Sequence, residues 1–440
     1  RATSCYSFLR AAGHPEAHLE QAAALGQTAL ALTEEDYLGA LPRFEAAAGK
    51  VGIRPIVGGT LTTEIGPLTF VCRKREGYRR LCQLTSQVHL GGARGEPLAR
   101  WADLEAWAGE GSFVLTGGRR GELARLLRAR DESGAERLLR RLCDLYGSRS
   151  VLVELQRLGC AGDRRLTLQQ VALARRLCLR YVATGDVRYV AREDFPVYDL
   201  LTCTRYLQTV DTPFAGRPAN DLQYLRSGAE MAREFEDLPE ALALTLKVAD
   251  ACDELGLSRD RYVPSFNGVA EDEQHGLLER LVHEGVKARY PRPMWRQVAP
   301  RVADELRIIA KLGLSGYFLL VWDVCRWARE QGIRCAGRGS AAGSVVCYAL
   351  RIANVDAYSR DITPARFLNE ERTESLPDID VDFARDGRDK VLDYILRRYG
   401  AGHVAMTGTY VRYHARSAIR DVGRALALPP AENVVEHLVA

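Results

Sequence analysis

Short apolar runs alternate with amphipathic segments over residues 1 to about 190. The runs have the length and composition of buried strands, which we expect at Ala29–Leu32, Ile56–Gly58, Leu68–Val71, Ser112–Leu115, Val151–Leu155 and Tyr181–Ala183. Segments with helical apolar spacing, such as Ala17–Ala24 and Glu136–Tyr146, lie between several of these runs. This alternation predicts an α/β layered or barrel unit with parallel strands.

The pattern changes after this region. Residues 190–300 read as mostly helical, with a linker at 262–268 (YVPSFNG). A later helix over Tyr317–Glu330 is ended by Gly332, and the short run Ile333–Cys335 then leads into a Gly/Ser-rich loop. A chain of 440 residues is long enough for two to four domains, at roughly 100–200 residues per domain.

Composition excludes several classes of protein. Hydrophobic residues make up 47% and charged residues 27%, which excludes disorder, collagen and coiled coil. No apolar run approaches the roughly 18 residues of a membrane span, and no charged-then-apolar leader opens the chain. Eleven dispersed cysteines without a CxxC pair indicate thiols in a reducing compartment. We therefore expect no membrane association and a cytoplasmic location.

Residues 337–344 read GRGSAAGS and lead directly into an apolar helical segment. Small residues let backbone N–H groups approach an anion, and the N-terminus of the following helix adds its positive end. Arg338 lies within the loop as a bidentate donor. The alternative is a tight turn whose small residues serve helix packing, and the loop alone does not decide between the two.

Residues 377–383 read PDIDVDF. In a strand the carboxylates of Asp378, Asp380 and Asp382 share one face, and the apolar residues between them share the other. Clustered carboxylates repel one another unless a cation neutralises them, and oxygen ligands of this kind suit Mg²⁺ when phosphates complete its shell. We favour a metal site over a solvated acidic edge.

Carboxylates, a Gly/Ser loop and arginines together are typical of two-metal nucleotidyl transfer. Arg366, in ARFLNEER, lies between the two motifs and is a second candidate for the triphosphate charge. Its spacing is equally consistent with a surface ion pair to Glu370.

Four arginines, Arg412, Arg416, Arg420 and Arg424, recur every four residues near the end of the chain. This spacing places four guanidinium groups on one stripe of a helix, where they are suited to a DNA backbone. A solvated helix face with internal pairing to Asp421 is the alternative. The net charge of +4 by itself does not indicate nucleic-acid binding.

Three segments in order, GYFLLVWDVCRWAREQGIRCAGRGSAAGSVVCYAL, ARFLNEERTESLPDIDVDF and RSAIRDVGRAL, closely resemble the bacterial C-family DNA polymerases. This family comprises the alpha subunit of DNA polymerase III and the error-prone DNA polymerase. The resemblance implies a palm of the nucleotidyltransferase superfamily, in which catalytic Asp378 and Asp380 hold two Mg²⁺. It also implies that the triphosphate of the incoming dNTP is bound by Arg338, Gly339, Ser340 and Arg366. Asp382 lies beside the metal pair in the family pattern and is not one of the ligands.

The N-terminal part resembles the family's PHP domain, a distorted (βα) barrel. Members with an active site carry His-x-His, Asp-His-Asp, a further acidic residue and Asp-x-His. The corresponding positions here are Arg1-Ala2-Thr3, Glu34-Glu35-Asp36, Thr60 and Asp186-Val187-Arg188. Because most imidazole ligands are replaced and Arg188 adds a cation, we expect no metals and a structural role in this domain. A phosphoesterase or proofreading exonuclease is the disfavoured alternative.

We therefore expect an α/β multidomain chain with a degenerate PHP barrel over 1–245, the first palm segment over 246–408 and the start of a helical thumb over 409–440. The resemblance implies a bacterial DNA-directed DNA polymerase for replication or error-prone repair synthesis, acting on primer–template DNA and dNTP. The degenerate PHP motifs and TYVRYHARSAIRDVG favour the error-prone branch. The third catalytic carboxylate and the parts that bind a sliding clamp and accessory subunits are expected beyond residue 440. The alternative is a catalytically inactive scaffold or DNA-binding relative.

Overall fold

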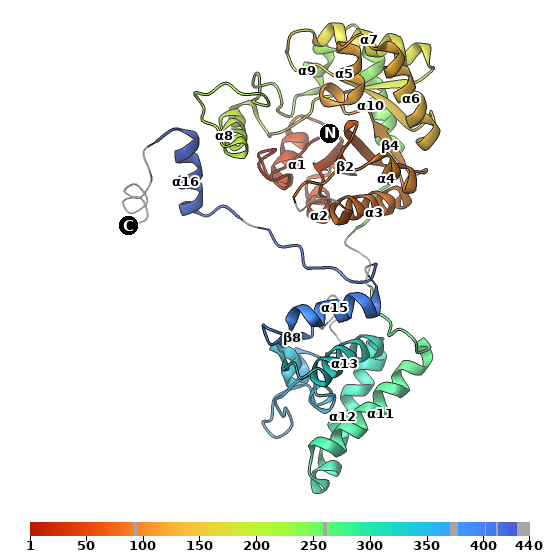
Figure 1. The fold of residues 1–440 in the computed structure, drawn as a ribbon, viewed down its shortest axis with the longest axis vertical. Coiled ribbons are helices and arrows are strands. Elements are labelled where there is room, and N and C mark those ends of the chain that lie inside the picture. The colour runs from red at the N-terminus through yellow and green to blue at the C-terminus, as the bar shows by residue number, and fades with distance from the viewer. Residues whose placement is uncertain (92–94, 258–261, 370–376, 401, 411, 429–440) are drawn as a thin grey trace. The chain divides into compact units, whose positions relative to one another are not determined.

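The structure is a computed structural model, and it describes residues 1–91, 95–257, 262–369, 377–400, 402–410 and 412–428. The chain forms two compact units (Figure 1). The first, here called the barrel unit, comprises Arg1–Asp260 and Tyr410–Ala440. The second, called the helical unit, comprises Arg261–Thr409.

A six-stranded sheet in the order β1-β2-β3-β4-β5-β6 forms the centre of the barrel unit. Its strands are β1 (Ala29–Glu35), β2 (Arg54–Thr63), β3 (Gly66–Cys72), β4 (Ser112–Leu115), β5 (Val151–Gln156) and β6 (Arg180–Thr184). Each contains one of the six predicted apolar runs, so these strand predictions are confirmed. Ala2 bridges Leu32 of β1 and Val187 beyond β6, and the segment at Ala2 thus lies between the two edges of this curled sheet.

The expectation of parallel strands throughout is wrong for β3. The pairs β1–β2, β4–β5 and β5–β6 are parallel, whereas β3 runs antiparallel to both of its neighbours. The reason is a two-residue connection, Glu64-Ile65, which joins Thr63 to its partner Gly66 as a hairpin. Parallel strands need a long crossover connection, and this segment has no room for one.

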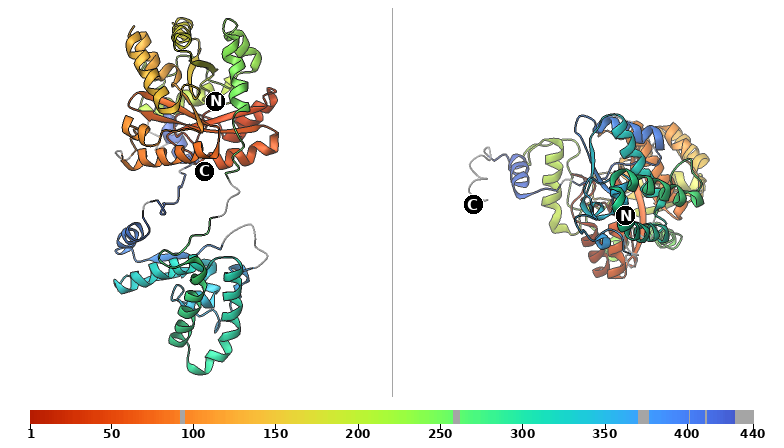
Figure 2. Two further views of the ribbon diagram at one scale, coloured as in Figure 1. Left: turned by 90° about the vertical axis from the view of Figure 1, so that its right-hand side faces the viewer. Right: turned by 90° about the horizontal axis from the view of Figure 1, so that it is seen from below.

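Helices lie on both sides of this sheet (Figure 2). The helices of the barrel unit that precede residue 260 are α1 (Pro15–Ala24), α2 (Leu41–Val51), α3 (Arg75–Gly91), α4 (Trp101–Ala106), α5 (Glu122–Arg128), α6 (Glu132–Tyr146), α7 (Asp163–Arg176), α8 (Phe195–Tyr206), α9 (Gly228–Glu234) and α10 (Pro239–Asp250), of which α8 lies away from the sheet (Figure 1). In α6, the Asp131 carboxylate accepts a hydrogen bond of 2.8 Å from Gly134 N and so caps the helix. Leu138, Leu139 and Leu142 then recur on the face that α6 buries in the core.

The helical unit is built from α11 (Gln274–Arg289), α12 (Trp295–Lys311), α13 (Ser315–Glu330), α14 (Val345–Ala349) and α15 (Arg388–Tyr399), with the strands β7 (Cys335–Arg338) and β8 (Asp380–Phe383). The predicted helix over Tyr317–Glu330 is α13, and Gly332 ends it with a φ of +71°. Asp323 on α13 is buried and accepts hydrogen bonds from the hydroxyls of Tyr394 (2.6 Å) and Tyr399 (2.9 Å) on α15. These bonds fix the helix that follows β8.

The described part of the last predicted segment includes α16 (Ala415–Ala425), which packs against α8 of the barrel unit. Val210 N donates to Ala425 O at 2.9 Å, and the Tyr410 hydroxyl donates to Gly39 O at 3.0 Å. In the described part of the chain no single helix is long and apolar enough to cross a membrane. Two consecutive helical segments, 292–311 and 315–330, pass that test only when taken together, and the chain bends by 114° between them.

Candidate active site

The Gly/Ser loop and the carboxylate motif, separate in sequence, lie on two adjacent strands. β7 pairs antiparallel with β8, with Arg338 opposite Asp380 and Ala336 opposite Asp382. Asp380 and Asp382 are exposed while Val381 between them is partly buried, which confirms the predicted alternation. Asp378 comes before the strand and is also exposed.

Arg338 contacts the carboxylate face directly. Its Nε donates to Asp382 Oδ1 at 3.2 Å, and its Nη2 lies 3.9 Å from Asp380 Oδ2. Gly339 follows with a φ of +64°, a left-handed conformation that favours glycine. A Cβ at this position would lie 3.5 Å from Asp380 Oδ2, so the loop backbone passes close to the carboxylate. Ser340 is exposed in the adjoining 3₁₀ turn, Gly339–Gly343.

The backbone of Arg366 lies in a second 3₁₀ turn, Pro364–Arg366, which packs against the turn of the Gly/Ser loop. Its side chain, like Glu370, lies outside the part of the chain that the structure describes. The choice between a triphosphate contact and an ion pair to Glu370 therefore stays a prediction.

The donor set on this face fits Mg²⁺ in combination with a substrate. Within the described residues no group of three or more His, Cys, Asp or Glu side chains is arranged to hold a metal ion. Mg²⁺ ordinarily takes one or two carboxylates and completes its shell with water and substrate phosphates. The exposed carboxylates of Asp378 and Asp380 are suited to that mode, in which a phosphate-bearing substrate would supply the remaining oxygens.

The expected role of the helix after the Gly/Ser loop is wrong. That helix, α14, is short, and Glu305 from α12 already occupies its N-terminus. Val345 N and Val346 N each donate to the Glu305 carboxylate at 3.0 Å, and Ser344 Oγ donates to it at 2.6 Å. A buried internal carboxylate thus takes the place that an external anion was expected to fill, and the loop before the helix is left as the anion candidate.

Tyr317 is a site residue that the motifs did not identify. Ile379 N, the amide between Asp378 and Asp380, donates to the Tyr317 hydroxyl at 2.9 Å. Burial raises the pKa of Tyr317, and the charges of Asp378 and Asp380 add to that rise. Tyr317 therefore lies near both carboxylates and attaches their segment to α13. Its place at the start of a buried helix gave no sequence signal for this contact.

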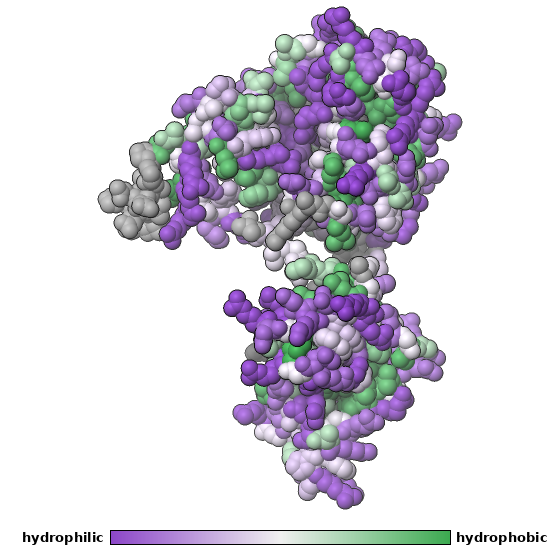
Figure 3. Space-filling view, viewed as in Figure 1, coloured by the Kyte–Doolittle hydropathy of each residue, from purple (hydrophilic) through white to green (hydrophobic). Residues whose placement is uncertain are grey.

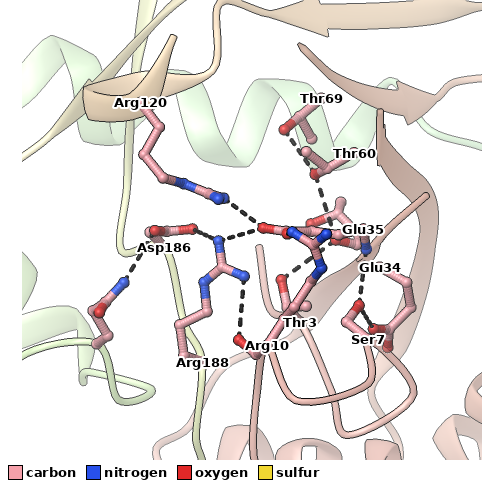
Figure 4. A network of polar contacts seen from close by, with 12 residues as sticks. Thr3, Ser7, Arg10, Glu34, Glu35, Thr60, Thr69, Arg120, Asp186 and Arg188 are labelled. Atoms are coloured by element: carbon pink, nitrogen blue, oxygen red, sulfur yellow. Dashed lines mark hydrogen bonds and ion pairs between the residues drawn. The ribbon is translucent and has the colours of Figure 1, made fainter. Parts of the chain in front are cut away.

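The four PHP motif positions converge in the barrel unit, where arginines pair with the carboxylates (Figure 4). Arg188 Nη2 lies 2.7 Å from Glu35 Oε1 and 3.0 Å from Asp186 Oδ1, and all three side chains are nearly completely buried. Arg120 and Arg10 contact Glu35 at 2.5 and 2.8 Å. These five residues are called the arginine network below.

The arginine network keeps its carboxylates ionised. Burial alone raises the pKa of Glu35, but the charges of Arg188, Arg120 and Arg10 outweigh burial and hold that pKa well below its usual value. The pKa of Asp186 is likewise lowered, since Arg188 and Arg1 outweigh its burial. Guanidinium groups thus supply the positive charge that metal ions would supply, and the donor set does not fit a multinuclear metal site.

The remaining PHP positions are held by hydrogen bonds within the barrel. Thr60 Oγ1 lies 3.0 Å from Thr69 Oγ1, and Asp36 accepts bonds of 2.6 and 2.7 Å from Thr62. Glu34 is fully buried and accepts from Ser4 and Ser7. Its burial outweighs these hydrogen bonds and raises the pKa of Glu34 to about 7.

The four arginines near the end of the chain are all exposed. Arg416, Arg420 and Arg424 lie on α16, whose visible face in Figure 3 is strongly hydrophilic. The prediction that all four share one helix is wrong for Arg412, because α16 begins only at Ala415. None of the four forms an ion pair with another described residue. Asp421, the internal partner suggested by the sequence, instead accepts a hydrogen bond from the Tyr413 hydroxyl.

Comparison with known proteins identifies two domains. Residues 1–158 match the PHP domain, and residues 276–439 match the bacterial DNA polymerase III alpha NTPase domain. The chain is 39% identical to the error-prone DNA polymerase of Symbiobacterium thermophilum over 98% of its length, and 37% identical to DNA polymerase III subunit alpha of Pseudomonas aeruginosa over 91%. It spans 41% and 36% of the lengths of these two relatives. The chain belongs to the family of bacterial DNA polymerase III alpha subunits and error-prone DNA polymerases.

Proposed function

We propose that the full-length protein is a Mg²⁺-dependent DNA-directed DNA polymerase. The primer 3′-hydroxyl attacks the α-phosphate of a dNTP and pyrophosphate leaves. The observation that carries the proposal is the pairing of β7 with β8, which places Arg338 and Gly339 beside Asp380. The enzyme acts on primer–template DNA in the bacterial cytoplasm, in replication or error-prone translesion repair synthesis.

In this proposal Asp378 and Asp380 hold two Mg²⁺. Bound metal lowers the pKa of the attacking hydroxyl and neutralises charge on the transferring phosphoryl group. Arg338 exchanges its exposed contact with Asp382 for the triphosphate, and this exchange costs little because surface ion pairs contribute about 0–1 kcal/mol. The backbone N–H groups of Gly339 and Ser340 add neutral donors.

Arg366 adds charge to the triphosphate site from its neighbouring turn. Arg416, Arg420 and Arg424 on α16, with Arg412 before it, contact the DNA backbone, and their contribution to binding falls as salt rises. We assign the barrel over 1–245 a structural role, 246–408 to the first palm segment and 409–440 to the start of the thumb. A sliding clamp and accessory subunits bind other parts of the full-length protein.

Primer extension by the full-length protein tests this proposal. Asp378→Asn and Asp380→Asn each remove a metal ligand, so extension falls to background while the fold is retained. Asp382→Asn is the matched control, because Asp382 lies on the same face of the same strand and holds no metal in the proposal. Wild-type extension by either of the first two variants would contradict the assignment of Asp378 and Asp380 as metal ligands, whereas no extension by the unmutated full-length protein would favour the alternative of an inactive DNA-binding scaffold.

A further inference from the structure

Two cysteines of the helical unit lie against each other near the Gly/Ser loop. Cys335 begins β7 and is partly buried, whereas Cys325 on α13 is completely buried. The Sγ of Cys335 lies 3.7 Å from Cys325 O, and the two thiols share a hydrogen bond. Arg329, one turn along α13 from Cys325, donates from Nη1 to the Sγ of Cys335 at 3.5 Å.

This arrangement activates one thiol and leaves the other protonated. The hydrogen bond from Cys325 lowers the pKa of Cys335 to about 6; burial opposes that effect, and the charge of Arg329 supports it. The pKa of Cys325 is raised, first by that hydrogen bond and then by burial. Burial raises the pKa of Cys347, which lies in the same core, to about 12. The pKa of Cys335 is thus lowered and the pKa of Cys325 is raised while the two residues lie in contact, which favours the thiolate on Cys335.

We propose that Cys335 and Cys325 form a peroxide-sensitive dithiol that oxidises to an intramolecular disulfide. The Cys335 thiolate attacks one oxygen of a hydroperoxide, which gives Cys335 sulfenic acid and releases hydroxide or alkoxide. The Cys325 thiol then attacks the sulfenic sulfur, forms the S–S bond and releases water. The two sulfurs supply the two electrons that reduce the peroxide, and a dithiol reductant reverses the reaction.

One cysteine of this dithiol, Cys335, lies on the same strand as a residue of the candidate active site, Arg338. Cys335 is opposite Phe383 in the β7–β8 ladder, and the same ladder ends with Arg338 opposite Asp380. A bond to Cys325 draws the start of β7 toward α13 and ends the contact of Arg329 with the thiolate. The oxidation itself does not depend on the proposed polymerase activity.

Peptide mapping of the full-length protein tests the proposal. The reduced protein is treated with equimolar hydrogen peroxide, its remaining thiols are alkylated, and the disulfides are identified by mass spectrometry. A Cys325–Cys335 linkage that dithiothreitol removes is expected. A Cys325→Ala variant should instead accumulate a sulfenic acid on Cys335 that dimedone traps. Peroxide treatment that leaves Cys335 unmodified, or joins it to another cysteine, would overturn the proposal.

The pH dependence of alkylation gives a second readout. The rate at Cys335 in the wild type should reach half its maximum at a pH well below about 8.5, the midpoint of an ordinary thiol. Arg329→Gln should move the midpoint upward. Arg397→Gln, which removes an exposed arginine of α15, should leave it unchanged. A wild-type rate that still rises steeply through pH 8 would contradict the activated thiolate.

Discussion

Arg188→Met is expected to destabilise the barrel unit by about 3–5 kcal/mol, because it removes one partner of a buried ion pair. The side chains of Arg188, Glu35 and Asp186 are 3%, 5% and 4% exposed, so water cannot replace the lost cation. Arg10→Met removes another partner of Glu35, but the Arg10 side chain is 29% exposed. Its expected cost is about 0–1 kcal/mol.

Hydrogen exchange of β1 and β6 peptides across a urea series measures this difference, because both strands belong to the barrel unit. The pKa values of Glu35 and Asp186 are lowered by folding, so the contribution of Arg188 is complete above about pH 4–5, where unfolded carboxyls are ionised. This stabilising contribution of Arg188 is lost as the pH falls below that range, and the free energies of unfolding of Arg188→Met and Arg10→Met should then approach each other. Equal stabilities of the two variants at pH 7.5 would refute the reasoning, as would stabilisation of wild-type β1 and β6 by Mn²⁺ or Zn²⁺.

Three further variants test individual contacts. Glu34→Gln should stabilise the barrel unit by a few kcal/mol at pH 8 and hardly at pH 5 in the same exchange assay. The reason is that the wild type loses stability as the pH rises toward the raised pKa of Glu34, about 7. Equal effects at both pH values would contradict a buried neutral Glu34. Tyr317→Phe should raise the Mg²⁺ concentration needed for extension by about tenfold while the fold is retained, and an unchanged requirement would exclude positioning of the carboxylates by Tyr317. Glu305→Gln should cost the helical unit about 1–3 kcal/mol and expose the α14 amides to exchange, because one acceptor of the cap is lost; unchanged protection would show that the cap is dispensable.

The strands of the barrel were predictable because buried strands leave continuous apolar runs. The antiparallel direction of β3 was also encoded, in the short segment between Thr63 and Gly66, but it was missed because apolar periodicity carries no information on strand direction. The alternation of Asp380 with Val381 on β8 was predictable for the same local reason.

Contacts distant in sequence could not be predicted in this way. Glu305 reaches the N-terminus of α14 only because α12 packs beside it, and no local pattern marks that carboxylate as a cap. Arg10 and Arg120 join Glu35 from two other segments of the barrel, although the motif at Asp186–Arg188 indicated that a cation would replace metal there. The role of Tyr317 could not be predicted either, because its partner Ile379 is distant in sequence.

The central claim is that Asp378 and Asp380 hold the catalytic metals, and anomalous diffraction from Mn²⁺ tests it most directly. Crystals of the full-length protein with a dideoxy-terminated primer–template, the next dNTP and Mn²⁺ place the ions without assuming activity. The account predicts anomalous peaks within about 2.0–2.3 Å of the Asp378 and Asp380 carboxylates and the triphosphate, and none in the arginine network. Peaks among Glu35, Asp186 and Arg188, with none at Asp378 and Asp380, would contradict it.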